Sequence, residues 1–247
     1  MAFLHSIAGL LSDPPPAYAF ELSEAGLAAA EIGRQPRLSF GALPRDVLAI
    51  SPVRDNVLRP EALLAQIRAM LPGDGSRKRR RAALILPDYA VRVTVLDFDD
   101  FPSDSRQQAS LVRFRLKRTI PFDVDSAALS FHPQPARSRG NKNVDVVAAV
   151  APLEIVAHYE APFRLAGFHP GHITTSMLAA LELAPAAGLQ VVAKRTGRVL
   201  SVAVSDQGVL RLVRTIEMAA FNAEEIVGHL FPTLAYVEDQ FGAAPEI

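Results

Sequence analysis

Residues 82–122 constrain the fold more than any other part of the chain, because their hydrophobic pattern changes from strand to helix at positions marked by proline. Ala82–Leu86 and Val91–Phe98 are apolar runs of strand length, and the second carries valine at alternate positions. Ser103–Arg118 has apolar residues at helical spacing, and an Ile-Pro-Phe tripeptide follows at 120–122. This order predicts two strands, a loop and an amphipathic helix.

The same alternation continues on both sides of this stretch. A hairpin is predicted over residues 18–32, and another over 199–216, where Gly208 can supply the positive φ that a tight turn needs. Predicted helices begin at Pro60, a position where a helix tolerates proline, and at Asn222, which has the pattern of a helix N-cap. Strands that alternate with helices in this way predict an α/β (α+β) protein.

Composition excludes several classes of function. The 247 residues contain 26 basic and 26 acidic side chains, so the net charge is zero and no overall field attracts nucleic acid. Cysteine is absent, which excludes disulfides, thiolate metal sites and a cysteine nucleophile. His169 and His172 have a spacing that can bind metal, but no third ligand lies near them in the sequence, so we predict no metal site.

The N-terminal segment is where the sequence allows a direct membrane contact. Residues 1–11 carry apolar side chains at helical spacing, without the basic n-region or the cleavage site of a signal peptide. We expect a short helix docked on the body of the protein, with a helix at a membrane surface or on a partner as the alternative. No apolar run reaches the ~20 residues that a transmembrane helix needs.

Several prolines and short motifs at the predicted ends of strands and helices occur in an order and spacing that point to a family. They are Pro87, Pro102, the tripeptide at 120–122, and the strand and helix of Val144–Ala166 followed by Gly167. In this order they resemble the PilM family, the actin-like cytoplasmic proteins of type IV pilus assembly. The cytoplasmic part of the type II secretion protein GspL is a relative of that family. The resemblance implies an actin-like (ribonuclease H-like) fold, in which two lobes surround a nucleotide cleft and an inserted subdomain packs on the first lobe.

The resemblance divides the chain into five parts. Residues 1–17 are expected to form the N-terminal helix and a proline linker. The first lobe comprises 18–81 and 152–187, on either side of an inserted αβ subdomain at 82–151. Residues 188–247 form a partial second lobe, because the chain ends before the last strand and the glycine-rich adenosine loop of the family.

The resemblance also permits a check of the nucleotide site, in which two β-hairpins hold phosphate. Such turns need glycine so that backbone N–H groups approach the oxygens, and an acidic residue that acts through Mg²⁺. The first family hairpin, Asp-Ile-Gly-Ser-Ser, falls on Glu21–Ala25, which puts Ser23 at the glycine and Glu24 beside the phosphate. The lysine that follows in the family falls on Ala28.

The second hairpin departs from the family in a similar way. Its acidic metal partner falls on Lys194, and its later pair of glycines falls on Ala219 and Ala220. We therefore expect no catalytic residues, no cofactor and no ATP hydrolysis, although the charge of Lys194 can still attract a phosphate. The degenerate nucleotide site would comprise Glu21, Ser23, Lys194 and Thr196.

The resemblance implies a scaffold or adaptor of a type IV pilus or type II-secretion-like platform, located in the cytoplasm at the inner membrane. It implies binding of the N-terminal cytoplasmic tail of a bitopic partner of the PilN type, with a pilus or secretion motor ATPase as a further partner. A groove between the first lobe and the insert would hold the tail, as an added β-strand or as a short strand in an apolar groove. Candidate groove residues are Pro87, Val91, Val93, Phe98, Phe101, Ile120 and Phe122.

Two other functions remain open. An active actin-like ATPase, or a sugar kinase of that fold, would have to bind nucleotide despite Ser23 and Lys194. An unrelated α/β interaction module would instead use residues 1–11 at a membrane.

Overall fold

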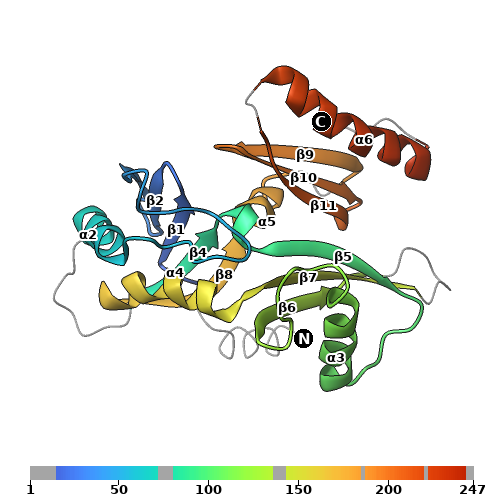
Figure 1. Cartoon of the computed structure of the whole chain (residues 1–247), viewed down its shortest axis with the longest axis horizontal. Helices are drawn as coiled ribbons and strands as arrows, with labels where there is room; N and C mark the ends of the chain where they lie inside the picture. The colour runs from blue at the N-terminus through green and yellow to red at the C-terminus, as the bar shows by residue number, and fades with distance from the viewer. Residues whose placement is uncertain (1–14, 72–79, 136–142, 185–186, 220–221, 243–247) are drawn as a thin grey trace.

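The computed structural model describes residues 15–71, 80–135, 143–184, 187–219 and 222–242. Within these ranges the chain forms three sheets, each with its own apolar core (Figure 1). Residues 1–11 and Ala220, on which two of the sequence predictions fall, lie outside the described residues. None of the described helices combines the length and the apolar character needed to cross a membrane.

The first lobe is a five-stranded sheet with two helices on one face. Its elements are β1 (Tyr18–Ser23), β2 (Gly26–Glu31), β3 (Arg37–Ala42), α2 (Pro60–Met70), β4 (Arg80–Leu86), α4 (Leu153–Leu165) and β8 (Phe168–Thr175). The strands lie in the order β3-β2-β1-β4-β8, in which β4 is parallel to both β1 and β8, and the β1–β2 and β2–β3 pairs are antiparallel. Figure 1 shows α2 and α4 on the same side of this sheet.

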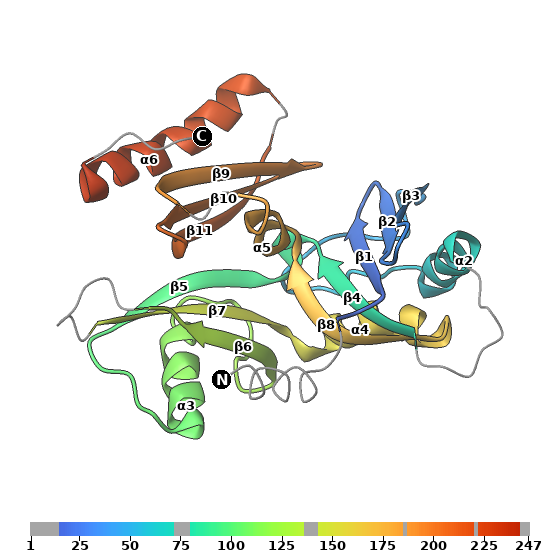
Figure 2. The same ribbon diagram turned by 180° about the vertical axis from the view of Figure 1, so that it is seen from behind.

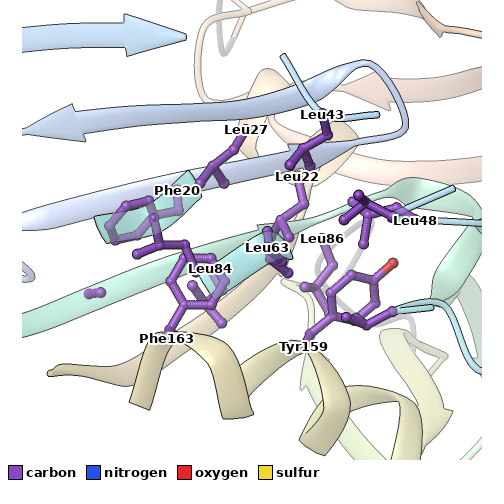
Figure 3. Packing of buried hydrophobic residues seen from close by; sticks show 14 of the residues in the cluster. Phe20, Leu22, Leu27, Leu43, Leu48, Leu63, Leu84, Leu86, Tyr159 and Phe163 are labelled. Atoms are coloured by element: carbon purple, nitrogen blue, oxygen red, sulfur yellow. The ribbon is translucent and has the colours of Figure 1, made fainter. Parts of the chain in front are cut away.

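Aromatic and leucine side chains fill the space between this sheet and its helices (Figure 3). The ring of Phe20 on β1 lies with its centroid 4.8 Å from that of Phe163 on α4 and 4.8 Å from that of Phe168 on β8. Leu84 of β4 and Leu63 of α2 are fully buried in the same cluster. Because successive strand residues point to opposite faces, this burial fixes the register of the strands.

The inserted subdomain is an antiparallel three-stranded sheet with one helix. It comprises η1 (Asp88–Ala90), β5 (Arg92–Phe98), α3 (Ser105–Leu116), β6 (Ala127–Pro133) and β7 (Val144–Pro152), with strand order β5-β7-β6. Helix α3 begins where Asp104 accepts hydrogen bonds from the backbone N–H groups of Arg106 and Gln107. Its buried residues Val112 and Leu116 pack on the sheet.

One predicted boundary is corrected by the strand pairing. The insert was predicted to begin at residue 82, which would place β4 in it. However, Phe20 of β1 pairs with Leu84 of β4, and Thr175 of β8 pairs with Leu86. Strand β4 therefore lies in the centre of the first sheet, and the inserted sheet begins with Arg92.

Helix α5 (Ser176–Leu181) follows β8 and contacts β8 and β4 of the first sheet as well as β10. The second lobe comprises β9 (Leu189–Thr196), β10 (Val199–Asp206), β11 (Val209–Glu217) and α6 (Ala223–Phe241), with strand order β11-β10-β9. The predicted tight turn is present, with positive φ at Gln207 and Gly208. Asn222 caps α6 as predicted, since its side chain accepts a 2.8 Å hydrogen bond from the N–H of Glu225. The helix ends at Gly242 in the left-handed conformation.

The insert also rests on the second lobe, as Figures 1 and 2 show where β11 lies over β5 and β7. The side-chain amide of Gln134 both donates to the carbonyl of Leu210 and accepts from its N–H, each at 2.8 Å. Arg211 of β11 forms a buried ion pair with Asp145 of β7 at 3.0 Å. Replacing either partner alone would be destabilising, because the other would remain as an uncompensated buried charge.

A buried amide organises the segment between β3 and α2. Asn56 is fully buried, and its Oδ1 accepts from the Ser51 N–H at 2.9 Å and from the Tyr159 hydroxyl at 3.1 Å. Its Nδ2 donates to the carbonyls of Ser51 and Arg54. Burial raises the pKa of the Tyr159 phenol well above its ordinary value, so this hydroxyl remains a neutral donor.

We expect Asn56→Ala to lower the free energy of unfolding by about 3 kcal/mol, because it leaves buried backbone groups and the Tyr159 hydroxyl without partners. Tyr159→Phe removes only the donor and should cost about 1 kcal/mol. Urea unfolding of both variants measures the two free-energy changes, provided that the dependence of the unfolding free energy on urea concentration is the same as in the parent. Equal losses in the two variants would mean that the amide does not hold this segment.

Candidate functional site

Parallel pairing brings three strand ends together between the lobes. Because β1, β4 and β8 run in the same direction, their carboxyl ends lie at one edge of the first sheet. Glu21 lies near the end of β1, Asp88 follows β4 and Ser176 follows β8. The turn between β9 and β10 of the second lobe faces this edge and closes a cleft of about 170 Å³.

Asp88 is the residue that joins the two lobes at this edge. Its carboxylate is buried, with Oδ1 accepting from the Met177 N–H at 2.6 Å and Oδ2 accepting from the Ser201 hydroxyl at 2.9 Å. The Nζ of Lys194 lies 3.7 Å from the same Oδ2. A buried carboxylate needs such partners, since an unpaired charge away from water is very costly.

Lys194 brings a positive charge from β9 into the cleft. Its ammonium lies 3.8 Å from Glu21 Oε1 as well as 3.7 Å from Asp88, and it donates to the Thr196 hydroxyl at 2.8 Å. Ser176 donates a hydrogen bond to the same oxygen of Glu21. At an effective dielectric of about 20, each charge pair contributes about 4 kcal/mol of attraction before desolvation is subtracted. Lys194 therefore neutralises part of the acidic edge.

The polar side chains of the β1–β2 turn form hydrogen bonds with other residues of the chain. The Ser23 hydroxyl donates to the Gly26 carbonyl at 3.1 Å across the turn. Glu24 Oε1 accepts from the Ile50 N–H at 3.2 Å, which ties the turn to the segment before α2. The side chains at Ser23 and Glu24 thus have partners within the chain, at the turn where the family would present backbone N–H groups to a phosphate.

The turn between β9 and β10 contains a glycine, Gly197, that the sequence analysis did not identify. Gly197 has a φ of 58°, which favours glycine, and lies between Thr196 and Arg198. The guanidinium of Arg198 donates to the carbonyls of Met218 and Ala219. Asp88 was also missed, although an acidic residue two positions after the apolar strand Ala82–Leu86 was a signal that could have found it.

The predicted site residues do come together, since Glu21, Ser23, Lys194 and Thr196 all line this cleft. The charged residues lining it comprise four acids and two bases, which leaves two formal negative charges. They are Glu21, Glu24, Asp88, Glu217, Lys194 and Arg198. A pocket for a drug-sized ligand usually has about 300 Å³ or more, so this cleft is small as well as acidic.

Lys194→Met should lower the free energy of unfolding by about 2 kcal/mol, because Asp88 would keep its buried charge without a cation beside it. Asp88→Asn in the same background should restore part of this loss, with a coupling of about 1–2 kcal/mol in a double-mutant cycle. Chemical unfolding of the four proteins measures the coupling. Additive losses would mean that the two side chains do not interact.

A second surface lies between the first lobe and the insert. It is an apolar groove of about 360 Å³, and the described residues that line it include no carboxylate, lysine or arginine. Strands β6 and β8, each the outermost strand of its sheet, contribute to it. The lining residues are Leu86, Val91, Ala128, Leu129, Ser130, Ala149, Val150, Ala151, Val156, His172, Ile173, Thr174, Thr175 and Leu178.

The residues predicted to bind a partner peptide do not lie together in the structure. Val91 lines the apolar groove, whereas Pro87 lines the cleft between the lobes. Val93 is buried. The remaining four belong to the core of the insert, and they are Phe98, Phe101, Ile120 and Phe122. Their contact with a peptide stays a prediction, and sequence reasoning missed the groove residues on β6 and β8.

Solved structures share this arrangement. The chain is similar to the PilM–PilN type IV pilus biogenesis complex, with a TM-score of 0.69 and 22% identity over 94% of this chain and 67% of that one. The protein has the actin-like fold. It is also similar to the cytoplasmic domain of EpsL, an inner membrane component of the type II secretion system of Vibrio cholerae, with a TM-score of 0.55 and 16% identity over 91% and 77%.

A third structure with this fold is a Bacteroides thetaiotaomicron protein of unknown function with an actin-like ATPase fold. Its TM-score is 0.54 at 11% identity, over 90% of this chain and 76% of that one. Neither a protein-family model nor a curated protein matches the sequence. At sequence identities of 11–22%, these similarities establish a shared fold and nothing more.

Proposed function

We propose that the protein is a scaffold of a type IV pilus or type II-secretion-like assembly platform, cytoplasmic and peripheral at the inner membrane. It binds the N-terminal cytoplasmic tail of a bitopic, PilN-like membrane protein, and it does not hydrolyse ATP. The observation that carries the proposal is the apolar groove between the first lobe and the insert. The similarity to the PilM–PilN complex and to the EpsL cytoplasmic domain supports the assembly context.

The groove suits an extended peptide. Strands β6 and β8 are outermost in their sheets, so each has backbone groups on one side that no described strand of its own sheet occupies. A peptide strand can bond to such an edge while its alternate side chains enter apolar pockets. Ile173 of β8 is partly exposed in the groove and offers one such apolar contact.

The cleft between the lobes supports a role without hydrolysis. Its lining is acidic, and the Lys194 ammonium lies between the carboxylates of Glu21 and Asp88. A triphosphate would meet these carboxylates directly and would compete with them for Lys194. The scaffold therefore keeps the two-lobe architecture while an internal ion pair bridges the lobes.

Binding of the tail should depend on the groove. A synthetic peptide with the N-terminal cytoplasmic sequence of the PilN-like protein from the same genome should bind by isothermal titration calorimetry with a Kd below about 100 µM. Ile173→Asp should weaken binding at least about tenfold, because the groove would then hold an unpaired charge.

Leu165→Asp on the exposed face of α4 is the matched control and should bind like the parent. Both variants should remain folded and unfold cooperatively, since Ile173 is 36% and Leu165 67% exposed. If the peptide does not bind at about 100 µM, or if both variants bind equally well, the groove is not the docking site.

Nucleotide should leave the stability unchanged. Millimolar Mg·ATP or Mg·GTP should shift the melting temperature by less than about 1 °C, because only a ligand that binds the folded state stabilises it. Stabilisation by several degrees with ATP alone would instead support an active actin-like ATPase, and ATP hydrolysis would then be measured directly.

A further inference from the structure

The β3 edge of the first sheet carries exposed apolar side chains. Leu38 and Phe40 are 84% and 63% exposed and point to the same face of the strand. Their partners on β2 are Ala30 and Ala28, whose small side chains do not cover them. The ring of Phe40 lies over Gly26, where the absence of a side chain leaves room for it.

The backbone of this strand also faces outward. The Leu43 N–H donates to the Ala25 carbonyl across the β2–β3 pair, and bonded pairs alternate along an antiparallel ladder. The odd-numbered residues of β3 therefore bond to β2. The N–H and C=O groups of Leu38, Phe40 and Ala42 point away from the sheet, and no described strand pairs with them. Leu38 and Phe40 therefore offer both outward backbone groups and exposed apolar side chains to a partner.

Three arginines flank this edge. Arg34 and Arg37 lie at the start of β3 and Arg45 lies just after its end, and all three are exposed. No described residue forms an ion pair or hydrogen bond with any of their side chains. Glu31 of β2 lies opposite Arg37 in the strand pairing, but its carboxylate forms no ion pair with that side chain, so the three guanidinium groups can complement an acidic ligand.

We propose that β3 is a docking edge for an extended acidic segment of a partner protein, which adds to the first sheet as a sixth strand. Its alternate apolar side chains would lie beside Leu38 and Phe40, and its carboxylates would pair with the flanking arginines. This edge lies at the opposite end of the sheet from β8, so the proposal does not depend on the peptide groove.

Two other occupants fit the edge less well. A second copy paired antiparallel through β3 would place Arg37 of one copy near Arg45 of the other, and like charges repel. Anionic lipid would attract the arginines, but its headgroups do not present donors and acceptors in the alternating order of a strand, which the outward N–H and C=O groups of Leu38 and Phe40 would match. A peptide strand satisfies both the backbone and the charges.

The test uses the full chain and hydrogen exchange. A short peptide of alternating valine and glutamate is the probe, with the same peptide carrying lysine in place of glutamate as its control. The acidic peptide should slow exchange of the Leu38, Phe40 and Ala42 amides by about tenfold or more. The odd-numbered amides of β3, which already bond to β2, should not change. The lysine peptide should give no protection.

Variants separate charge from apolar contact. Leu38→Ser, which removes the apolar contact without changing the charge, should abolish protection by the acidic peptide, whereas Leu183→Ser, at a site 88% exposed on the segment after α5, should leave it intact. The double variant Arg34→Glu and Arg37→Glu should lose the acidic peptide and accept the lysine peptide. Calorimetry should give the same order of affinities.

Several results would overturn the proposal. Absence of protection by the acidic peptide at millimolar concentration would mean that the edge does not accept a strand. Protection that appears with rising protein concentration alone, together with a dimer in light scattering, would assign the edge to a second copy. Protection only with vesicles of phosphatidylglycerol would assign it to a membrane.

Discussion

The arrangement of the lobes depends on the buried carboxylate of Asp88. Parallel pairing of β4 with β1 and β8 places this residue where the first lobe meets the second. Its oxygens then bond to the Met177 N–H and to the Ser201 hydroxyl, with the Lys194 ammonium beside them. The desolvation cost of burying Asp88 is offset only while these partners are in place, so the closed arrangement of the lobes depends on the Ser201 hydrogen bond and the Lys194 ammonium.

Local pattern predicted most of the fold. The helical spacing of apolar residues and the capping residues predicted the helices that begin near Pro60 and Asn222, and a glycine predicted the turn at Gly208. These signals can be read from the sequence because each acts within a few residues. The lobe to which β4 belongs was not predictable in this way. An apolar strand such as Ala82–Leu86 fits any sheet, and its partners are set by pairing with residues far away in the chain.

The candidate site was partly predictable for a similar reason. Glu21, Ser23, Lys194 and Thr196 lie at hairpins whose position follows from the chain order, and the structure brings them to one cleft. Asp88 and Ser176 were missed because they follow strands that meet only in the folded sheet. The groove residues on β6 and β8 were missed for the same reason, because these two strand edges meet only in the folded protein.

The proposed scaffold acts through its surfaces rather than through its cleft. The Gln134–Leu210 pair and the Arg211–Asp145 ion pair hold the insert on the second lobe, and Lys194 and Asp88 hold the second lobe on the first. In such a body the sheet edges are the sites where backbone groups remain available to another chain. Strand β3 carries a basic, apolar edge and β8 borders an uncharged groove, so the two ends of one sheet suit partners of different chemistry. A body that holds two partners at a fixed separation needs no chemistry of its own to join them, because binding both raises the local concentration of each near the other.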